Sequence, residues 1–129
     1  MAWTVKTLTY AGGHGGACGI EATETINANG NSSSLDITGL RYVSVLVNNG
    51  ATEDCDFTVE GSLDDSNWET VAYGSGSSGS YTQASLNVPI STTTHLYLPP
   101  DDFIRFIRFN VSDANTTAGT VFTVYAVRF

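Results

Sequence analysis

The side chains best suited to chemistry in this sequence are carboxylates that follow one another within a short stretch. They are Glu53, Asp54, Asp56, Glu60, Asp64, Asp65 and Glu69. Loop carboxylates can bind Ca²⁺, which takes several oxygen ligands, and Asp64 and Asp65 stand next to Ser66 and Asn67. The same residue types also turn a chain by hydrogen-bonding their own backbone. We favour this second interpretation, a solvated strand face followed by a turn, and expect no metal site.

The histidines and cysteines do not form a recognisable metal or catalytic set. His14 lies among glycines and His95 in an alternating segment, while Cys18 and Cys55 are far apart in the sequence. Structural zinc needs four ligands at regular spacing, so we expect one loop histidine and one histidine on a sheet surface. Cys55 shares its face with apolar residues and is expected to be buried. A disulfide between the two cysteines is the weaker alternative, because the sequence shows no secretory signal.

Motifs for enzymatic chemistry are missing from the sequence. It has no Gly-x-Ser-x-Gly nucleophile elbow, and the glycine-rich runs at 12–16 and 74–79 lack the Gly-Lys-Ser/Thr ending of a phosphate-binding loop. Paired carboxylates for glycoside hydrolysis would need one shielded acid, and nothing in the acidic stretch indicates shielding. We therefore expect no enzyme activity and no cofactor.

Charge and composition exclude several other classes of function. The 129 residues carry a net charge of −8, and the cations other than histidine are Lys6, Arg41, Arg105, Arg108 and Arg128. These scattered cations cannot neutralise a run of phosphates, so nucleic acid and anionic membranes are not expected as partners. The sequence begins without the basic and apolar regions of a signal peptide, and no apolar run approaches the roughly 20 residues of a membrane helix. We expect the chain to be made in a cytoplasm.

The elements that must position any functional residue are short β-strands. Two sets of apolar residues recur at every second position within 41–70: Val43, Val45 and Val47, and then Cys55, Phe57 and Val59. Side chains alternate across a strand, so each set predicts a buried face. Asn48-Asn49-Gly50 contains residues that tolerate positive φ, which predicts a turn that joins the two strands as an antiparallel hairpin.

Further strands follow from the same alternation. We expect them at 3–10, 84–90, 94–98, 103–111 and 120–129, with shorter ones near 21–27, 35–37 and 71–73. The run 103–111 could also suit a helix, but its aromatic and β-branched residues favour a strand. The total of about eight or nine short strands, with no convincing helix, predicts an all-β fold. We expect an antiparallel β-sandwich of the jelly-roll type.

The N-terminal part differs in composition from the rest of the chain. Residues 1–19 combine a β-prone segment with a run of glycines, and residues 20–129 form the expected single sandwich domain. So many glycines make the backbone flexible or contorted. The segment 3–10 is therefore either an edge strand reached by a long loop or an arm that pairs with a neighbouring chain, and the sequence leaves both open.

One short run resembles a hairpin of known proteins. Val59-Glu60-Gly61-Ser62-Leu63-Asp64-Asp65-Ser66-Asn67-Trp68 resembles a hairpin of discoidin-type (coagulation factor C-domain-like) sandwiches. The same hairpin recurs in many β-sandwich structural proteins of tailed bacteriophages. The resemblance implies that the acidic segment turns the chain and that Trp68 folds back over the sheet. Discoidin-type lectins are commonly bridged by cysteines at their ends, and Cys18 and Cys55 do not bracket this domain.

The chain as a whole is similar to accessory proteins of phage virions, above all capsid decoration (cement) proteins and small tail or neck components. The similarity lies in a short, acidic all-β domain rich in Gly, Thr, Ser and Asn, with a Phe-Ile-Arg-Phe pattern at 103–106. It implies a homo-oligomer, often a trimer, that binds the major capsid protein and stabilises the capsid lattice of the virion.

Under this interpretation the partner-binding residues lie near the two ends of the chain. They are Trp3, Val5, Leu8, Tyr10, Phe122, Tyr125 and Phe129. A strand that adds to a neighbour's sheet binds through main-chain hydrogen bonds. Ordinary core or edge packing is the alternative role for these residues.

A carbohydrate-binding module is the alternative function, with a glycan as the partner. It requires an exposed aromatic platform, for which the candidates are Trp68, Tyr73, Tyr81 and Tyr97. Trp68 fits a core position better than a platform.

Overall fold

The computed structural model describes residues 2–9, 17–75, 80–100 and 104–128. Within them lie thirteen strands and no helix. The strands are β1 (Thr4–Thr9), β2 (Ala17–Ile26), β3 (Gly30–Asn31), β4 (Leu35–Asp36), β5 (Tyr42–Asn49), β6 (Cys55–Ser62), β7 (Glu69–Thr70), β8 (Tyr73–Ser75), β9 (Tyr81–Thr82), β10 (Leu86–Val88), β11 (Thr93–Tyr97), β12 (Phe106–Asp113) and β13 (Thr120–Val127). Nowhere in the described residues does a helix occur that could span a membrane.

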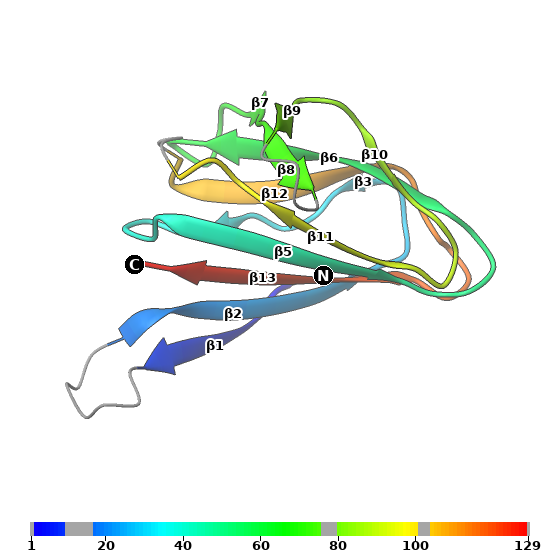
Figure 1. Cartoon of the computed structure of the whole chain (residues 1–129), viewed down its shortest axis with the longest axis horizontal. Coiled ribbons are helices and arrows are strands. Elements are labelled where there is room, and N and C mark those ends of the chain that lie inside the picture. Colours follow the sequence, from blue (N-terminus) through cyan, green and yellow to red (C-terminus); the bar gives the residue numbers. More distant parts are fainter. Residues whose placement is uncertain (1, 10–16, 76–79, 101–103, 129) are drawn as a thin grey trace.

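The strands form two antiparallel sheets that pack face to face (Figure 1). The seven-stranded sheet has the order β1-β2-β13-β5-β11-β8-β9. The six-stranded sheet has the order β10-β6-β12-β3, with β4 on β12 and β7 on β6. The first main strand, β2, pairs with the last, β13, and from β5 onward the long strands β5, β6, β11, β12 and β13 alternate between the sheets, as in a jelly roll. The expected sandwich is confirmed, but the strands outnumber the expected eight or nine because several are only two or three residues long.

Aromatic residues from both sheets meet at the centre of the core. Phe122 of β13 lies 4.7 Å from Phe109 of β12 and 5.0 Å from Phe57 of β6, measured between ring centroids. The alternating valines of β5 and the Cys55, Phe57 and Val59 set of β6 are buried, as their spacing predicts. Burying a large apolar side chain stabilises the fold by about 1.5–3 kcal/mol, so this layer holds the two sheets together.

The expected hairpin between β5 and β6 is wrong. β5 pairs with β11 and β13 in the seven-stranded sheet, whereas β6 belongs to the other sheet. Asn48 and Asn49 are the last residues of β5, and the positive φ of the connection falls on Thr52, at 96°. Asn49 is buried rather than exposed in a turn. The chain therefore crosses from one sheet to the other at this point.

Buried hydrogen bonds explain why Asn49 closes the end of β5. Its Nδ2 donates to the carbonyl oxygens of Glu53 (2.8 Å) and Val88 (3.0 Å). Its Oδ1 accepts from Asn115 Nδ2 (3.0 Å) and Thr120 Oγ1 (2.7 Å). One side chain thus connects β5, the segment before β6, the end of β10 and the start of β13.

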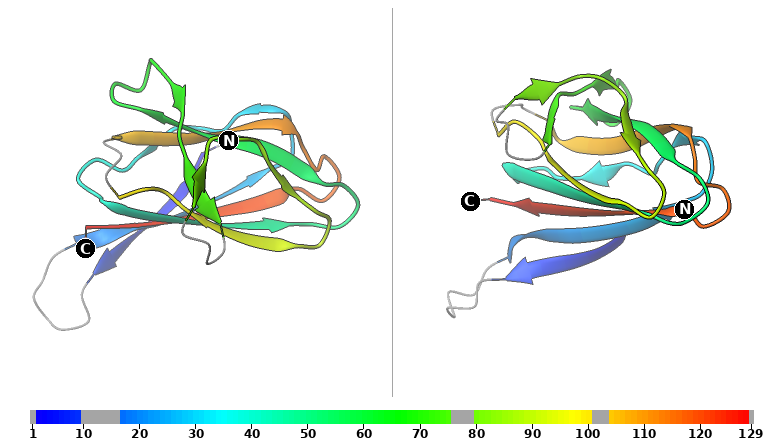
Figure 2. Two further views of the ribbon diagram at one scale, coloured as in Figure 1. Left: turned by 45° about the horizontal axis from the view of Figure 1, so that its top comes forward. Right: turned by 45° about the vertical axis from the view of Figure 1, so that its right-hand side comes forward.

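β1 is an edge strand that pairs with β2 of its own chain. Residues 4–9 of the segment 3–10 thus lie at the edge of the seven-stranded sheet. β1 and the adjoining end of β2 project away from the six-stranded sheet (Figures 1 and 2). Every residue of β1 except Leu8, which is half-buried, is exposed. The expected division between residues 19 and 20 falls inside β2.

The C-terminal strands and the turn at Asp64 agree with the sequence predictions, whereas the position of Trp68 does not. The run 103–111 forms a strand from Phe106 onward, and β13 lies centrally between β2 and β5. The hairpin around Asp64 is confirmed, because β7 pairs back onto β6. Trp68, however, is not a core residue. It is half-buried on the outer face of the six-stranded sheet, where the Arg108 guanidinium carbon lies 4.1 Å from its ring centroid.

Candidate functional site

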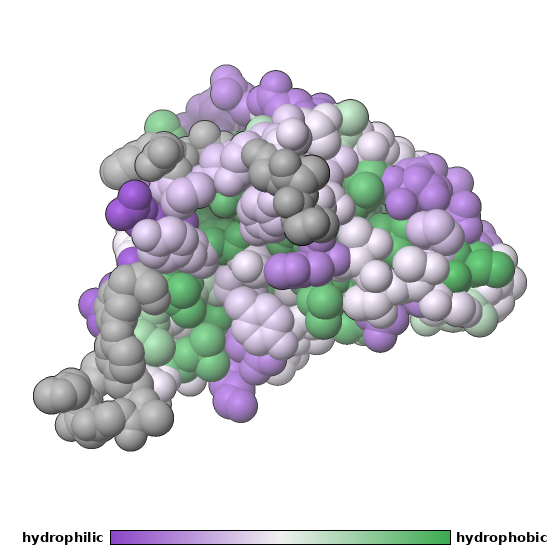
Figure 3. All heavy atoms as spheres, in the orientation of Figure 1, coloured by the Kyte–Doolittle hydropathy of each residue, from purple (hydrophilic) through white to green (hydrophobic). Residues whose placement is uncertain are grey.

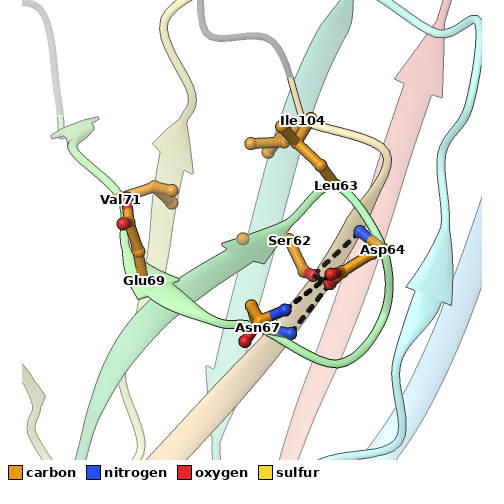
Figure 4. Close-up of a pocket in the computed structure, with 8 residues that line it drawn as sticks. Ser62, Leu63, Asp64, Asn67, Glu69, Val71 and Ile104 are labelled. Atoms are coloured by element: carbon orange, nitrogen blue, oxygen red, sulfur yellow. Dashed lines mark hydrogen bonds between the residues drawn. The ribbon is translucent and has the colours of Figure 1, made fainter.

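The turn after β6 is organised by the Asp64 carboxylate (Figure 4). The backbone N–H groups of Asn67 and Ser66 donate to Asp64 Oδ1 at 2.8 and 2.9 Å, and Asn67 Nδ2 donates to Oδ2 at 2.6 Å. These bonds, chiefly those from Asn67, hold the pKa of Asp64 well below its usual range. The segment is thus a turn built on its own side chains, as the sequence indicates.

A cavity of about 300 Å³ lies beside this turn. Leu63, Val71 and Ile104 supply its apolar lining, and Asn67 and Glu69 also line it (Figure 4). The Asp64 carboxylate, which also lines the cavity, is engaged by the turn.

The acidic stretch spreads over separate partners instead of converging. Glu60 accepts a hydrogen bond from Arg108 Nε at 2.7 Å, and Asp56 accepts one from Asn87 at 2.7 Å. Hydroxyl groups of Thr116 and Thr117 donate to Glu53 and lower its pKa. Within the described ranges, no three His, Cys, Asp or Glu side chains gather closely enough to hold a metal ion.

The histidines and cysteines also lie apart. His95 is exposed beside Tyr97, with ring centroids 6.5 Å apart, and His14 lies outside the described residues. Cys55 is buried and Cys18 half-buried, and both carry free thiols. Burial raises the pKa of the Cys55 thiol, which makes it a poor nucleophile.

The most distinctive surface is the outer face of the seven-stranded sheet, which we call the tyrosine face. It comprises Tyr42, Leu46, Tyr81, His95, Tyr97 and Tyr125. Four of the seven large hydrophobic side chains that are exposed in the described residues belong to it. Exposed apolar area concentrated on one face marks an interaction surface more often than scattered residues do.

The register of the sheet places three of these tyrosines in one row. Tyr125 of β13 stands opposite Ser44 of β5, Ser44 stands opposite Tyr97 of β11, and the row continues through Gly74 to Tyr81. Tyr97 lies across Gly74, because a Cβ on that glycine would stand only 2.4 Å from the Tyr97 ring. The ring centroids of Tyr81 and Tyr97 are 5.8 Å apart. Gly74 thus lets one tyrosine reach the next.

The sequence-predicted partner residues are divided by the fold. Leu8 and Tyr125 face outward on the seven-stranded sheet, whereas Val5 lies on the opposite, inner face of β1 and is 52% exposed. Trp3 packs on Phe109 of the core. Its Nε1 donates to the Ser33 carbonyl at 2.8 Å.

Three residues of the predicted set do not contribute to a described surface. Phe122 is fully buried in the core, because it occupies the inner face of the central strand β13. It is therefore not available to a partner. Tyr10 and Phe129 lie outside the described residues.

The candidates for an aromatic platform are likewise divided. Tyr81 and Tyr97 lie together on the tyrosine face, whereas Tyr73 is buried and Trp68 lies on the other sheet against Arg108. The sequence reasoning missed Tyr42 and Leu46. Their signal was present, because they alternate with the buried valines of β5 and must therefore point outward.

Glu24 is a buried carboxyl on the inner face of β2, and the sequence analysis did not single it out. Only 4% of the residue is exposed, and neither carboxyl oxygen has a hydrogen-bond partner in the structure. Burial raises the pKa of this group. Its alternation with Ala22 and Ile26, which are also buried, was the signal in the sequence.

These features define the protein as an antiparallel jelly-roll domain with an exposed aromatic sheet face and an exposed edge strand. No family model and no curated protein matches the sequence. Among solved structures, the fold is similar to that of the SPBc2 prophage-derived protein YomS, with a TM-score of 0.59. The two chains are 9% identical, and the match covers 83% of this chain and 92% of that one. At this identity the likeness shows a shared fold.

Proposed function

We propose that the chain is a non-enzymatic structural protein of a bacteriophage particle, and specifically a capsid decoration protein that binds the major capsid protein. The observation that carries the proposal is the tyrosine face, where exposed Tyr42, Leu46 and Tyr125 are available for a partner. Tyrosine combines a large apolar area with a hydroxyl group and is enriched at protein interfaces.

Two further observations support this proposal. The similar fold in a prophage-derived protein is consistent with a phage origin. The net charge of −8 opposes binding to nucleic acid and membranes, which leaves protein as the natural partner of an exposed aromatic face. On this basis the chain is a virion component that assembles on the capsid surface as a homo-oligomer.

Co-sedimentation with empty capsids of the phage that encodes the chain tests the proposal. We expect the wild type to bind, and Leu46→Asp to reduce binding at least about tenfold, because the new charge would be desolvated at the interface. Thr58→Asp is the matched control, since Thr58 is an outward residue of β6 on the opposite sheet. Equal loss in both variants, or binding to purified tails in place of capsids, would contradict the decoration role.

A glycan-binding function is the second candidate, and the Tyr81 and Tyr97 pair favours it. Both rings lie on the outer face, and Tyr81 is 46% exposed. A glycan array followed by titration would detect such binding. The function requires that Tyr81→Ala abolish binding while Tyr42→Ala, on the other side of the face, leaves it intact.

A further inference from the structure

Among the strands at the edges of the two sheets in the described residues, β1 is the longest. The other terminal strands, β3, β9 and β10, have two, two and three residues, whereas β1 has six. An exposed strand edge offers unpaired N–H and C=O groups to another strand. A partner that uses this edge must supply a strand of comparable length.

The hydrogen-bond pattern shows which residues of β1 point to the open edge. Arg128 N donates to Cys18 O at 2.9 Å, so these residues form a hydrogen-bonded pair between the ends of β13 and β2. Because bonding direction alternates along a strand, Gly19, Glu21 and Thr23 direct their backbone groups toward β1. Their partners are Leu8, Lys6 and Thr4. Val5 and Thr7 must therefore direct their N–H and C=O groups away from β2.

β1 is held at its start and uncovered along the rest of its length. Trp3 anchors it through the Ser33 carbonyl and Phe109. Beyond Trp3, Val5 is exposed, and Thr7 lines an open groove of about 510 Å³ with Ile20, Leu40 and other residues. Figure 3 shows hydrophobic side chains gathered at lower left, over the region where β1 and β13 end and β2 begins in Figure 1. An added strand would cover part of this area.

A second copy of β1 is the occupant that fits this edge best. Among the described strands, only β1 combines six residues with an open edge. Pairing of two identical strands in antiparallel orientation is self-complementary and closes as a two-fold dimer. The remaining choice is the register of the two strands.

Of the possible registers between the two β1 strands, one avoids both a like-charge pair and the irregularity in β1. A pair centred on Lys6 would place like charges opposite each other, which is destabilising. A pair centred on Thr7 would include the irregularity between Leu8 and Thr9. A pair centred on Val5 leaves the irregularity outside, places Lys6 opposite Thr4 and Thr7 opposite Trp3, and buries both Val5 side chains against each other. The paired segment of each copy is therefore Trp3–Thr7.

We propose that two copies of this chain pair through β1, antiparallel and with Val5 opposite Val5 of the second copy, to form one continuous sheet. The inference rests on the proposed assembly role, for which it names one partner. It also changes the expected number of copies from three to two. The tyrosine faces of both copies would then lie on the same side of the joined sheet.

Light scattering and site-specific crosslinking test this pairing. The wild type should have the mass of a dimer. In a Cys18→Ser background, Val5→Cys should form an intermolecular disulfide under mild oxidation, because facing Cα atoms of a hydrogen-bonded pair are about 5.5 Å apart. Thr7→Cys is the matched control and should not crosslink, since two Thr7 residues would be four positions, roughly 13 Å, out of register.

A proline variant tests the same edge without cysteine chemistry. Val5→Pro removes an N–H that points away from β2, so the variant should become monomeric and keep its fold. A monomeric or trimeric wild type, or crosslinking of Thr7→Cys in preference to Val5→Cys, would overturn the inference. If the wild type is monomeric but binds capsids, the β1 pairing is wrong and the decoration role stands. If the wild type is a dimer that does not bind capsids, the decoration role is wrong and the β1 pairing stands.

Discussion

The outer faces of the two sheets use their side chains in different ways. On the six-stranded sheet, polar groups bond to one another. Arg108 pairs with Glu60 and lies over Trp68, and Asn87 donates to Asp56. On the seven-stranded sheet, four large apolar or aromatic side chains remain exposed, namely Tyr42, Leu46, Tyr81 and Tyr125.

The difference bears on which face would bind a partner. The polar groups of the six-stranded sheet already have hydrogen-bond partners, whereas covering the apolar groups of the seven-stranded sheet would lower the free energy. A polar group with a good partner must lose that partner or be desolvated when another molecule binds, which offsets the new contact. Exposed apolar area gains about 25 cal/mol for each Å² removed from water. The contrast between the faces, rather than any single residue, supports the choice of the tyrosine face as the binding surface.

The largest effect on stability is expected from Asn49→Ala. This variant removes the buried side-chain hydrogen bonds that connect the two sheets, so it should destabilise the whole fold. The change removes one hydrogen bond each from Asn115 and Thr120, both fully buried, and two or more from backbone carbonyl groups. We expect a loss of about 3 kcal/mol or more in the free energy of unfolding, measured by chemical denaturation. Asn48→Ala is the control, because Asn48 is the exposed neighbour, and a similar loss there would contradict the role of Asn49.

Glu24→Gln should act in the opposite direction and stabilise the seven-stranded sheet. Burial raises the pKa of Glu24 in the folded state. The folded state therefore loses stability as the pH rises above the unfolded pKa, and the loss is complete above the folded pKa. Thermal melts at pH 7 should show a gain of about 1 kcal/mol or more for the variant, and melts near pH 4 should show almost none. A gain that is independent of pH would argue against titration of Glu24.

Arg108→Ala should destabilise the six-stranded sheet moderately. It removes the ion pair with Glu60 and the contact with the Trp68 ring, which together contribute about 1–2 kcal/mol. Capsid binding should be unchanged, because Arg108 lies on the face opposite the tyrosine face. A variant that is as stable as the wild type but fails to bind capsids would reverse the assignment of the two faces.

Gly74→Ala should disturb the tyrosine face with little change in stability. The added Cβ would lie 2.4 Å from the Tyr97 ring, so the ring must move away from its position beside Tyr81. We expect a loss of about 1 kcal/mol or less, because Tyr97 is a partly exposed side chain that can rotate. Tyrosine fluorescence and ring NMR signals would report the displacement, and unchanged Tyr81 and Tyr97 signals would contradict the described packing.

The smallest effect is expected from Asp64→Asn at neutral pH, seen mainly as a change in acid sensitivity. Hydrogen bonds lower the pKa of Asp64 in the folded state. The stability they contribute is fully present above the unfolded pKa and is lost as the pH falls toward the folded pKa. The variant should therefore lose less stability between pH 5 and pH 2 than the wild type, in an acid titration followed by circular dichroism. Identical acid profiles would show that the turn does not depend on the carboxylate.

Patterns within single segments predicted much of this structure. Alternation in β5 and β6 marked their buried faces, and the residue types after β6 indicated the Asp64 turn. Both depend on neighbours only a few residues away. The same alternation also indicates that Tyr42 and Leu46 point outward, because they alternate with the buried valines of β5.

Features that depend on distant partners were the ones that sequence reasoning missed. Asn49 has the composition of a turn residue, yet its bonds to Val88, Asn115 and Thr120 make it a buried connection between sheets. Trp68 is apolar enough for the core, yet it lies on the outer face of the six-stranded sheet, against Arg108 of a distant strand. The sequence interpretation places Phe122 among the partner-binding residues, and only the central position of β13 shows that its side chain is enclosed.

The sequence by itself determined the all-β class, the two-sheet architecture, most strand positions and the acidic turn, because period-two alternation and turn chemistry are local properties. The tertiary structure alone decided which strands are neighbours, that β1 is an edge strand, and that Tyr42, Tyr125, Tyr97 and Tyr81 share one face. Strand order sets these relations through contacts between residues far apart in the chain. A single strand's pattern shows which side of it is buried, but not which strand will lie beside it.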